Sequence, residues 1–177
     1  MNITTSIRRL AVVASGGAAA MTLLATAAVG TGADPIIGTG DDDTLRGTAR
    51  ADVIRGLGGD DWAYGRAGGD SIGGGGGDDY PFGGKGADIL KGGPGDDSFV
   101  PGGGLDRVRG GDDRDVVFLA KDHRADRVSC GAGRDRVYGA TSRDVVADDC
   151  EFVTSEPPSC RSLPIRMTTP YAEPARC

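Results

Sequence analysis

Three consecutive nonapeptides lie at the centre of the chain: GGGGDDYPF (74–82), GGKGADILK (83–91) and GGPGDDSFV (92–100). Each begins with two glycines, has aspartate at its sixth place and ends in three residues, which is long enough for a short strand. The same spacing continues in both directions, from Gly38 to Phe118, and gives nine units without an insertion or a deletion. A fixed period of this kind predicts a repeat structure in which every unit supplies the same piece of backbone.

Two places of the unit carry the pattern. The sixth place is aspartate in all nine units, and the eighth place is bulky and apolar in most of them, namely in Leu45, Ile54, Ile72, Leu90, Phe99, Val108 and Val117. Because side chains alternate between the two faces of a strand, only the eighth place of a three-residue strand can point inward. We therefore expect a glycine turn followed by a short strand in each unit, with two consecutive units closing one coil.

Stacked coils of this kind make an all-β fold, a parallel β-roll or solenoid, in which each aspartate lies over the aspartate two units away. One flank is expected to stack Asp43, Asp61, Asp79, Asp97 and Asp115, and the other Asp52, Asp70, Asp88 and Asp106. Neighbouring coils lie about 4.8 Å apart, so the carboxylates of a column repel one another unless a cation lies between them. Oxygen ligands from carboxylates and carbonyls favour Ca²⁺ over Mg²⁺ as that cation.

The segments GGGGDD (74–79), GGKGAD (83–88) and GGPGDD (92–97) resemble the loop of the RTX (haemolysin-type) calcium-binding nonapeptide family, whose pattern is Gly-Gly-x-Gly-x-Asp-x-U-x, with U apolar. The resemblance is strong over residues 38–118 and weak over 121–147. It implies a parallel β-roll that takes Ca²⁺ as its cofactor and binds each ion between stacked loops. The ligands it implies are the carboxylates of Asp61, Asp70, Asp79, Asp88, Asp97 and Asp106 and the carbonyl oxygens of Gly75, Gly77, Gly84, Gly86, Gly93 and Gly95.

The outer loops depart from this pattern. The second place is Thr39, Thr48, Leu57 or Arg66 in the first four units, and the fourth place is Asp41, Arg50 or Asp113 in three units. Pro81 also stands at an inward place. We therefore expect the calcium sites in the central loops rather than at either end.

Four segments follow from the distribution of residue types. Residues 1–33 combine Arg8 and Arg9 with a following apolar run and small residues, which predicts a cleaved export signal and an extracellular location. Residues 34–118 hold the regular repeats, and 119–153 hold degenerate repeats and a cap, after the two-residue insertion Leu119-Ala120. Residues 154–177 form a proline-rich tail that contains cysteines. No apolar run after the predicted signal has the roughly 20 residues of a membrane-spanning helix.

Cys130, Cys150, Cys160 and Cys177 are an even number of cysteines in a chain predicted to be exported, so we expect two disulfides. Three connectivities are possible, and we favour Cys130–Cys150 with Cys160–Cys177. The segments CGAGRDRV (130–137) and DDCEFV (148–153) resemble the cysteine-closed end of small secreted repeat proteins of this type from actinobacteria. No pair of cysteines has zinc-ligand spacing.

The net charge and the motifs of the sequence argue against several classes of function. The formal net charge of −6 argues against a nucleic-acid partner. His123 is the only histidine and has no nucleophile motif beside it, and the repeated acid pairs lack the differentiated environments that a glycosidase needs. We expect a secreted, non-enzymatic protein that folds on binding Ca²⁺. The alternative is a cell-surface or cell-wall adhesive protein in which calcium is purely structural.

Aromatic residues predict one further surface. Trp62 and Tyr80 occupy place seven, and Tyr64 and Phe82 place nine, of alternate units, so they should stack on one outer sheet face. We hypothesise that this face binds the proline-rich tail or an external glycan or protein partner.

Overall fold

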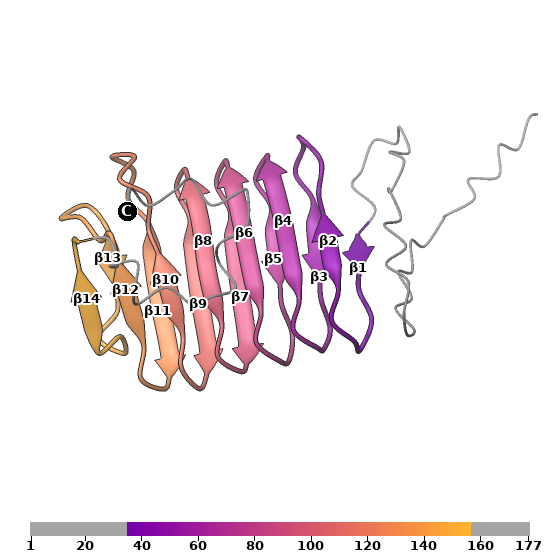
Figure 1. Ribbon diagram of the computed structural model, residues 1–177. Coiled ribbons are helices and arrows are strands. Elements are labelled where there is room, and N and C mark those ends of the chain that lie inside the picture. Colours follow the sequence, from indigo (N-terminus) through magenta and orange to yellow (C-terminus); the bar gives the residue numbers. More distant parts are fainter. Residues whose placement is uncertain (1–34, 157–177) are drawn as a thin grey trace, which may run out of the picture.

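The structure is a computed structural model that describes residues 35–156, a stack of parallel coils built from strands alone. Two seven-stranded sheets form its walls, and Figure 1 shows β4, β6 and β8 of one sheet running opposite to β7 and β9 of the other. Within residues 35–156 there is no helix long and apolar enough to cross a membrane. The predicted export signal (1–33) and most of the predicted tail lie outside the described residues.

One sheet, called the basic sheet below because its outer face carries Lys91, Arg107, Arg109 and Arg127, contains seven strands side by side. In order they are β1 (Ile36–Ile37), β3 (Val53–Arg55), β5 (Ser71–Gly73), β7 (Ile89–Pro94), β9 (Arg107–Asp112), β11 (Arg127–Ala132) and β13 (Val145–Val146).

The other sheet, called the aromatic sheet because its outer face carries Trp62, Tyr64, Tyr80 and Phe82, is built by the alternate units. Its strands are β2 (Thr44–Arg46), β4 (Trp62–Ala67), β6 (Tyr80–Lys85), β8 (Ser98–Gly103), β10 (Val116–Phe118), β12 (Arg136–Tyr138) and β14 (Phe152–Thr154). The repeat pattern does not predict β14. Its last residue, Thr154, falls in the predicted tail.

The register confirms one coil per two repeat units. Ile54 pairs with Ile72, and Leu90 with Val108, across neighbouring strands of the basic sheet. The insertion Leu119-Ala120 adds two residues to one coil, so that Val117 pairs with Val137, 20 residues later, instead of 18. The insertion is absorbed in the connection, so both sheets continue through the degenerate repeats.

The strands differ from expectation in length. We predicted three residues per strand, but β4, β6, β7, β8, β9 and β11 each contain six. They run on into the next loop because its glycines keep the parallel register, as Gly84 does with Gly102 and Gly93 with Gly111. The strand therefore carries its hydrogen bonding directly into the loop that follows.

Inward side chains from both sheets, one from most strands, fill the space between the sheets. These residues are at most 3% exposed: Leu45, Ile54, Ala63, Ile72, Leu90, Phe99, Val108, Val117, Val128 and Val137. Pro81 is buried at the same place of its unit. The predicted inward place is thus confirmed, and the core is only one side chain wide per strand.

Two other predictions are confirmed at the surface and at the cap. Cys130 and Cys150 form a disulfide with a Cα–Cα distance of 5.3 Å; Cys160 and Cys177 lie outside the described residues. On the aromatic sheet the rings of Trp62 and Tyr80 stack with centroids 4.6 Å apart, and those of Tyr64 and Phe82 stack at 4.9 Å. What this face binds stays a prediction.

Places two and four of the loop need a left-handed backbone. Gly75 and Gly77 have φ values of 131° and 118°, and the stack imposes the same region on Leu57 (92°) and Arg66 (81°). A residue with a Cβ in this region loses about 1–2 kcal/mol relative to glycine. Leu57 and Arg66 are therefore held in the repeat geometry by their neighbours, whereas Thr39 and Thr48 at the same place of the first two units do not have a positive φ.

Leu57→Gly is expected to raise the free energy of unfolding by up to about 1 kcal/mol, because the relieved strain exceeds the backbone entropy that glycine adds to the unfolded chain. Leu105→Gly is the matched control, since Leu105 is 56% exposed and Leu57 55%, but Leu105 is not among the positive-φ residues. The control should lose about 0.5–1 kcal/mol. Urea unfolding in excess calcium checks both, and equal effects of the two substitutions would contradict the assigned strain.

Candidate metal centre

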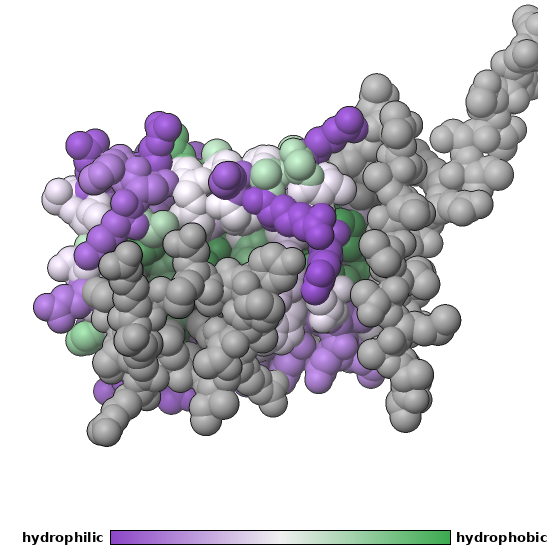
Figure 2. All heavy atoms as spheres, turned by 45° about the horizontal axis from the view of Figure 1, so that its top comes forward, coloured by the Kyte–Doolittle hydropathy of each residue, from purple (hydrophilic) through white to green (hydrophobic). Residues whose placement is uncertain are grey.

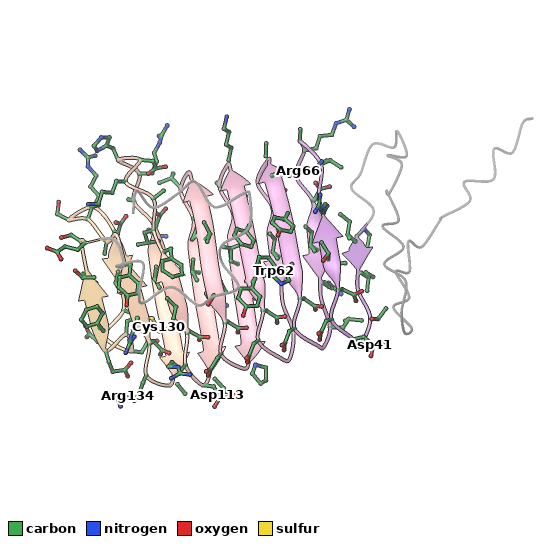
Figure 3. The ribbon with its side chains drawn as sticks, in the orientation of Figure 1. Asp41, Trp62, Arg66, Asp113, Cys130 and Arg134 are labelled. Carbon is green, nitrogen blue, oxygen red and sulfur yellow. A yellow bond between two sulfur atoms is a disulfide. The ribbon has the colours of Figure 1, made fainter. Side chains whose placement is uncertain are left out.

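The loops at the two rims of the stack hold the aspartates of place six in two columns. Figure 3 labels Asp41, Asp113 and Arg134 at one rim and Arg66 at the other. We call the loops of the first rim odd loops and those of the second even loops. Figure 2 shows hydrophilic side chains projecting from the loop rim that faces the viewer, over a pale surface. The place-six aspartates of both rims are buried, at 0–1% exposure from Asp61 to Asp115.

One carboxylate oxygen of each aspartate ties neighbouring coils together. The Asp61 amide donates a hydrogen bond to Oδ1 of Asp79 at 2.9 Å, and the Asp79 amide donates to Oδ1 of Asp97 at 2.8 Å. In the even loops the Asp70 amide donates to Oδ1 of Asp88 at 2.8 Å. The two expected columns, each with a step of two repeat units, are thereby confirmed.

The second carboxylate oxygen has no partner. In the described residues Oδ2 is buried and accepts no hydrogen bond in Asp61, Asp79, Asp97, Asp115 and Asp135 of the odd loops and in Asp70, Asp88 and Asp106 of the even loops. A buried charged oxygen without a donor is strongly unfavourable. Its repetition along both columns marks positions where a cation is needed.

Burial shifts the acidity of these groups. Desolvation by burial raises the pKa of Asp97 to about 8 and that of Asp79 to about 7, against an ordinary value of 3.8. The amide of the preceding aspartate opposes the shift, whereas the neighbouring carboxylates of the column add to it. Burial likewise raises the pKa to about 7 for Asp106 and Asp115 and to about 6 for Asp61 and Asp70. At neutral pH the protein alone therefore holds Asp79, Asp97, Asp106 and Asp115 only partly ionised.

Glycines leave room for an ion beside each free oxygen. A side chain at Gly74 or Gly92, the first place of its loop, would collide with Oδ2 of the aspartate five residues later. Oδ2 is therefore turned into its own loop, against bare backbone. Glycine stands at the first place in the other loops with a free Oδ2, except those of Asp106 and Asp135, which begin with Pro101 and Cys130.

Carbonyl oxygens supply further donors along the stack. A side chain at Gly93 would collide with the carbonyl oxygen of Gly75, and one at Gly95 with that of Gly77. The carbonyls of Gly84, Gly86 and Gly93 face the next loop in the same way, toward Gly102, Gly104 and Gly111. The space between consecutive loops is thus lined in part by carboxylate and carbonyl oxygens. This is a donor set that suits Ca²⁺, which accepts six to eight oxygens in irregular geometry.

In three loops Oδ2 accepts hydrogen bonds from protein groups instead, while Oδ1 of Asp43 is buried without a partner. The amide and hydroxyl of Thr39 donate to Oδ2 of Asp43 at 2.6 and 2.9 Å, and Thr48 donates to Asp52 in the same way. Thr141 donates its amide and hydroxyl to Oδ2 of Asp144 at 2.7 and 2.9 Å. These threonine-closed loops are the first of each column and the last even loop.

The repeat pattern does not distinguish threonine-closed loops from loops with a free Oδ2, and it predicts a shorter series of metal-binding loops. The end of the odd column was expected to be weak, yet Oδ2 of Asp115 and of Asp135 is as unpartnered as those at the centre. The column ends where Glu151 takes the place of the next aspartate and accepts the Asp135 amide at 2.7 Å. The available signal for a closed loop was a threonine shortly before the aspartate, four residues before it in Thr39 and Thr48 and three in Thr141.

One apparent metal-binding cluster has another explanation. Ligand atoms of Cys130, Asp149 and Cys150 lie within 4.8 Å of one another, but both cysteines are in the disulfide. Burial alone would raise the pKa of Asp149, but hydrogen bonds from the Cys130 amide, the Ser129 hydroxyl and the Gly131 amide hold it below its usual range. Asp149 therefore fastens the cap to β11.

A parallel solenoid whose glycine loops enclose two columns of partly unpartnered carboxylates is a cation-dependent repeat fold. The chain belongs to the family of the RTX calcium-binding nonapeptide repeat, whose model matches four times, at residues 29–49, 46–81, 73–107 and 82–117. These repeats bind Ca²⁺. No match was found among curated proteins or among solved structures.

Proposed function

We propose that this protein is exported and folds outside the cell when Ca²⁺ binds between its stacked loops, and that it acts as a non-enzymatic calcium-binding module. The observation that carries the proposal is the row of buried, unpartnered Oδ2 atoms in loops of a calcium-binding repeat family. The predicted signal over residues 1–33 supports export, and an extracellular location would supply calcium at the concentrations that such modules need, about 10⁻⁴–10⁻³ M.

The proposed ligands are the aspartates with a free Oδ2, together with the carbonyls of places two and four. Each ion would lie between two consecutive carboxylates of one column. The odd column from Asp61 to Asp135 offers four such spaces, and the even column from Asp70 to Asp106 offers two. We assign no ion to the threonine-closed loops, because their Oδ2 atoms already accept hydrogen bonds from the protein.

The narrow core explains why folding would depend on the metal. Most strands place a single apolar side chain in the core, which is little hydrophobic stabilisation for the backbone entropy lost in ordering nine residues. Binding free energy is then available as folding free energy, as in other small metal-dependent folds.

A non-enzymatic role is supported by the equivalence of the loops. The carboxylates repeat in the same environment, so none is set apart as an acid and another as a base. His123 lies exposed in the connection between the regular and degenerate repeats, with a φ of 67°.

Isothermal titration calorimetry should give about six calcium ions per chain, because two columns provide four and two spaces between unpartnered carboxylates. Circular dichroism should show strand signal appearing over the same titration and disappearing in EDTA. A stoichiometry of nine or more would mean that the threonine-closed loops also bind. A compact, strand-rich protein in EDTA with no heat of binding would overturn the proposal.

A further inference from the structure

The outer face of the basic sheet carries four exposed cations close together. Lys91, Arg107, Arg109 and Arg127, the basic cluster, lie on the adjacent strands β7, β9 and β11. Arg107 pairs in register with Arg127, and Lys91 with Arg109. Side chains paired in this way are about 5 Å apart between strands and about 7 Å apart along a strand. Four positive charges thus occupy one small area of a chain whose net charge is −6.

This cluster has no anionic partner in the part of the chain that the structure describes. The salt bridge in residues 35–156 joins Arg114 to Asp96, in the odd loops. The outward places in the first three residues of β7, β9 and β11 hold no acid: besides the cluster they are Ile89 and Ser129. Like charges directly across two strands are destabilising, so the arrangement works against the fold unless an anion binds.

One acid, Asp149, lies beside the outward Ser129, but it accepts hydrogen bonds from Ser129, Cys130 and Gly131 and forms no salt bridge with the cluster in the described residues. The segments outside the described residues add little negative charge. Residues 1–34 and 157–177 contain two acids, Asp34 and Glu173, against five arginines. An anion that matches four cations must therefore come from another molecule.

Shape and composition of the face indicate what that molecule is. The cations lie in register on neighbouring strands, and guanidinium groups bind phosphate, sulfate and carboxylate groups through paired hydrogen bonds. The outward places of this sheet carry no aromatic residue within residues 53–147, whereas single-stranded nucleic acids are held by stacking of bases on aromatic side chains. The rings that could stack are on the opposite sheet.

We infer that the basic cluster binds a linear anionic glycan, an extracellular polysaccharide with sulfate, phosphate or uronate groups along its chain. The inference rests on the proposed function in one respect, because the cluster is assembled only when the stack is folded. The calcium-loaded protein would lay its basic sheet along such a polymer, with two cations from β9 and one from each neighbouring strand.

The test is binding of the calcium-loaded full chain to heparin and to polygalacturonate, with neutral dextran and single-stranded DNA as comparisons. The cluster variant K91Q/R107Q/R109Q/R127Q should bind both anionic glycans at least tenfold more weakly. The matched control K121Q/R124Q/R134Q/R143Q removes the same charge from exposed positions outside the cluster and should stay within about threefold of the wild type.

Circular dichroism of each variant in calcium separates this inference from the proposed function. A wild-type protein that shows no calcium-induced strand signal would refute the proposed function, whatever it binds. Three results would overturn the inference: a folded wild type that binds neither glycan, an equal loss of glycan binding in the two fourfold variants, or tighter binding to DNA than to the glycans. If the fourfold variant fails to fold, R107Q/R127Q and K91Q/R109Q serve as two smaller tests, each expected to weaken binding.

Discussion

The double variant Asp79→Asn with Asp97→Asn should lose the calcium-induced strand signal at about 1 mM calcium, the weak end of affinities for extracellular calcium modules. Both side chains lie at the centre of the odd column, with Oδ2 buried and unpartnered. Asparagine can still accept the amide hydrogen bond through its carbonyl oxygen, but it replaces the free oxygen by an NH₂ group and removes the charge. Three of the proposed spaces lose a ligand, so the affinity there should fall more than tenfold.

The control for this experiment is Asp43→Asn with Asp52→Asn. These aspartates occupy the same place of the repeat, but Thr39 and Thr48 already donate to their Oδ2 atoms. The same change in charge and shape should leave the number of bound ions unaltered and the midpoint of the calcium titration within about threefold. Equal damage from the two double variants would show that the free Oδ2 does not identify the metal sites.

The stability of the protein should depend on pH in opposite directions with and without calcium. In EDTA, burial raises the pKa of Asp97 to about 8 and that of Asp79 to about 7, so the folded chain binds protons more tightly than the unfolded one. Stability in EDTA is then greatest below about pH 4 and falls as the pH rises toward 8. Each such carboxyl removes up to about 1.4 kcal/mol per pH unit within that window.

With saturating calcium the slope should reverse. The ligands must lose their protons to bind the ion, so the calcium affinity rises from about pH 5 to about pH 8 and then levels off. Urea midpoints in calcium, and the strand signal by circular dichroism in EDTA, each measured at several pH values, give the two dependences. Slopes of the same sign in the two conditions would contradict the view that protons and calcium compete for the buried carboxylates.

The nonapeptide period was enough to predict the fold because one unit contains a complete structural step. Aspartate at place six and an apolar residue at place eight fixed the loop, the inward direction and the step of two units per coil, which Ile54 and Ile72 confirm by their pairing. The sequence could not give the length of the strands. That length depends on glycines such as Gly93 and Gly111 pairing across coils, a property of the stack rather than of one unit.

The sequence predicts what kind of metal site the loops form, but it predicts less well which loops form one. All six aspartates proposed from the sequence carry a free Oδ2, yet Asp115 and Asp135 do as well, and Asp43 and Asp52 do not. The difference lies in which donors reach Oδ2 after folding. A threonine hydroxyl four residues away along the chain decides it, so a match to the repeat pattern alone does not distinguish a loop that needs an ion from one that is already closed.

The short terminal strands of the basic sheet determine how copies of this protein meet. β1 and β13 each contain two residues, Ile36–Ile37 and Val145–Val146, while β7, β9 and β11 between them contain six. A long open edge would invite another chain to add its own strand and start a fibre. Here an incoming copy finds two residues of edge strand at each end of the basic sheet and three at each end of the aromatic sheet, in β2 and β14, which disfavours growth by strand addition.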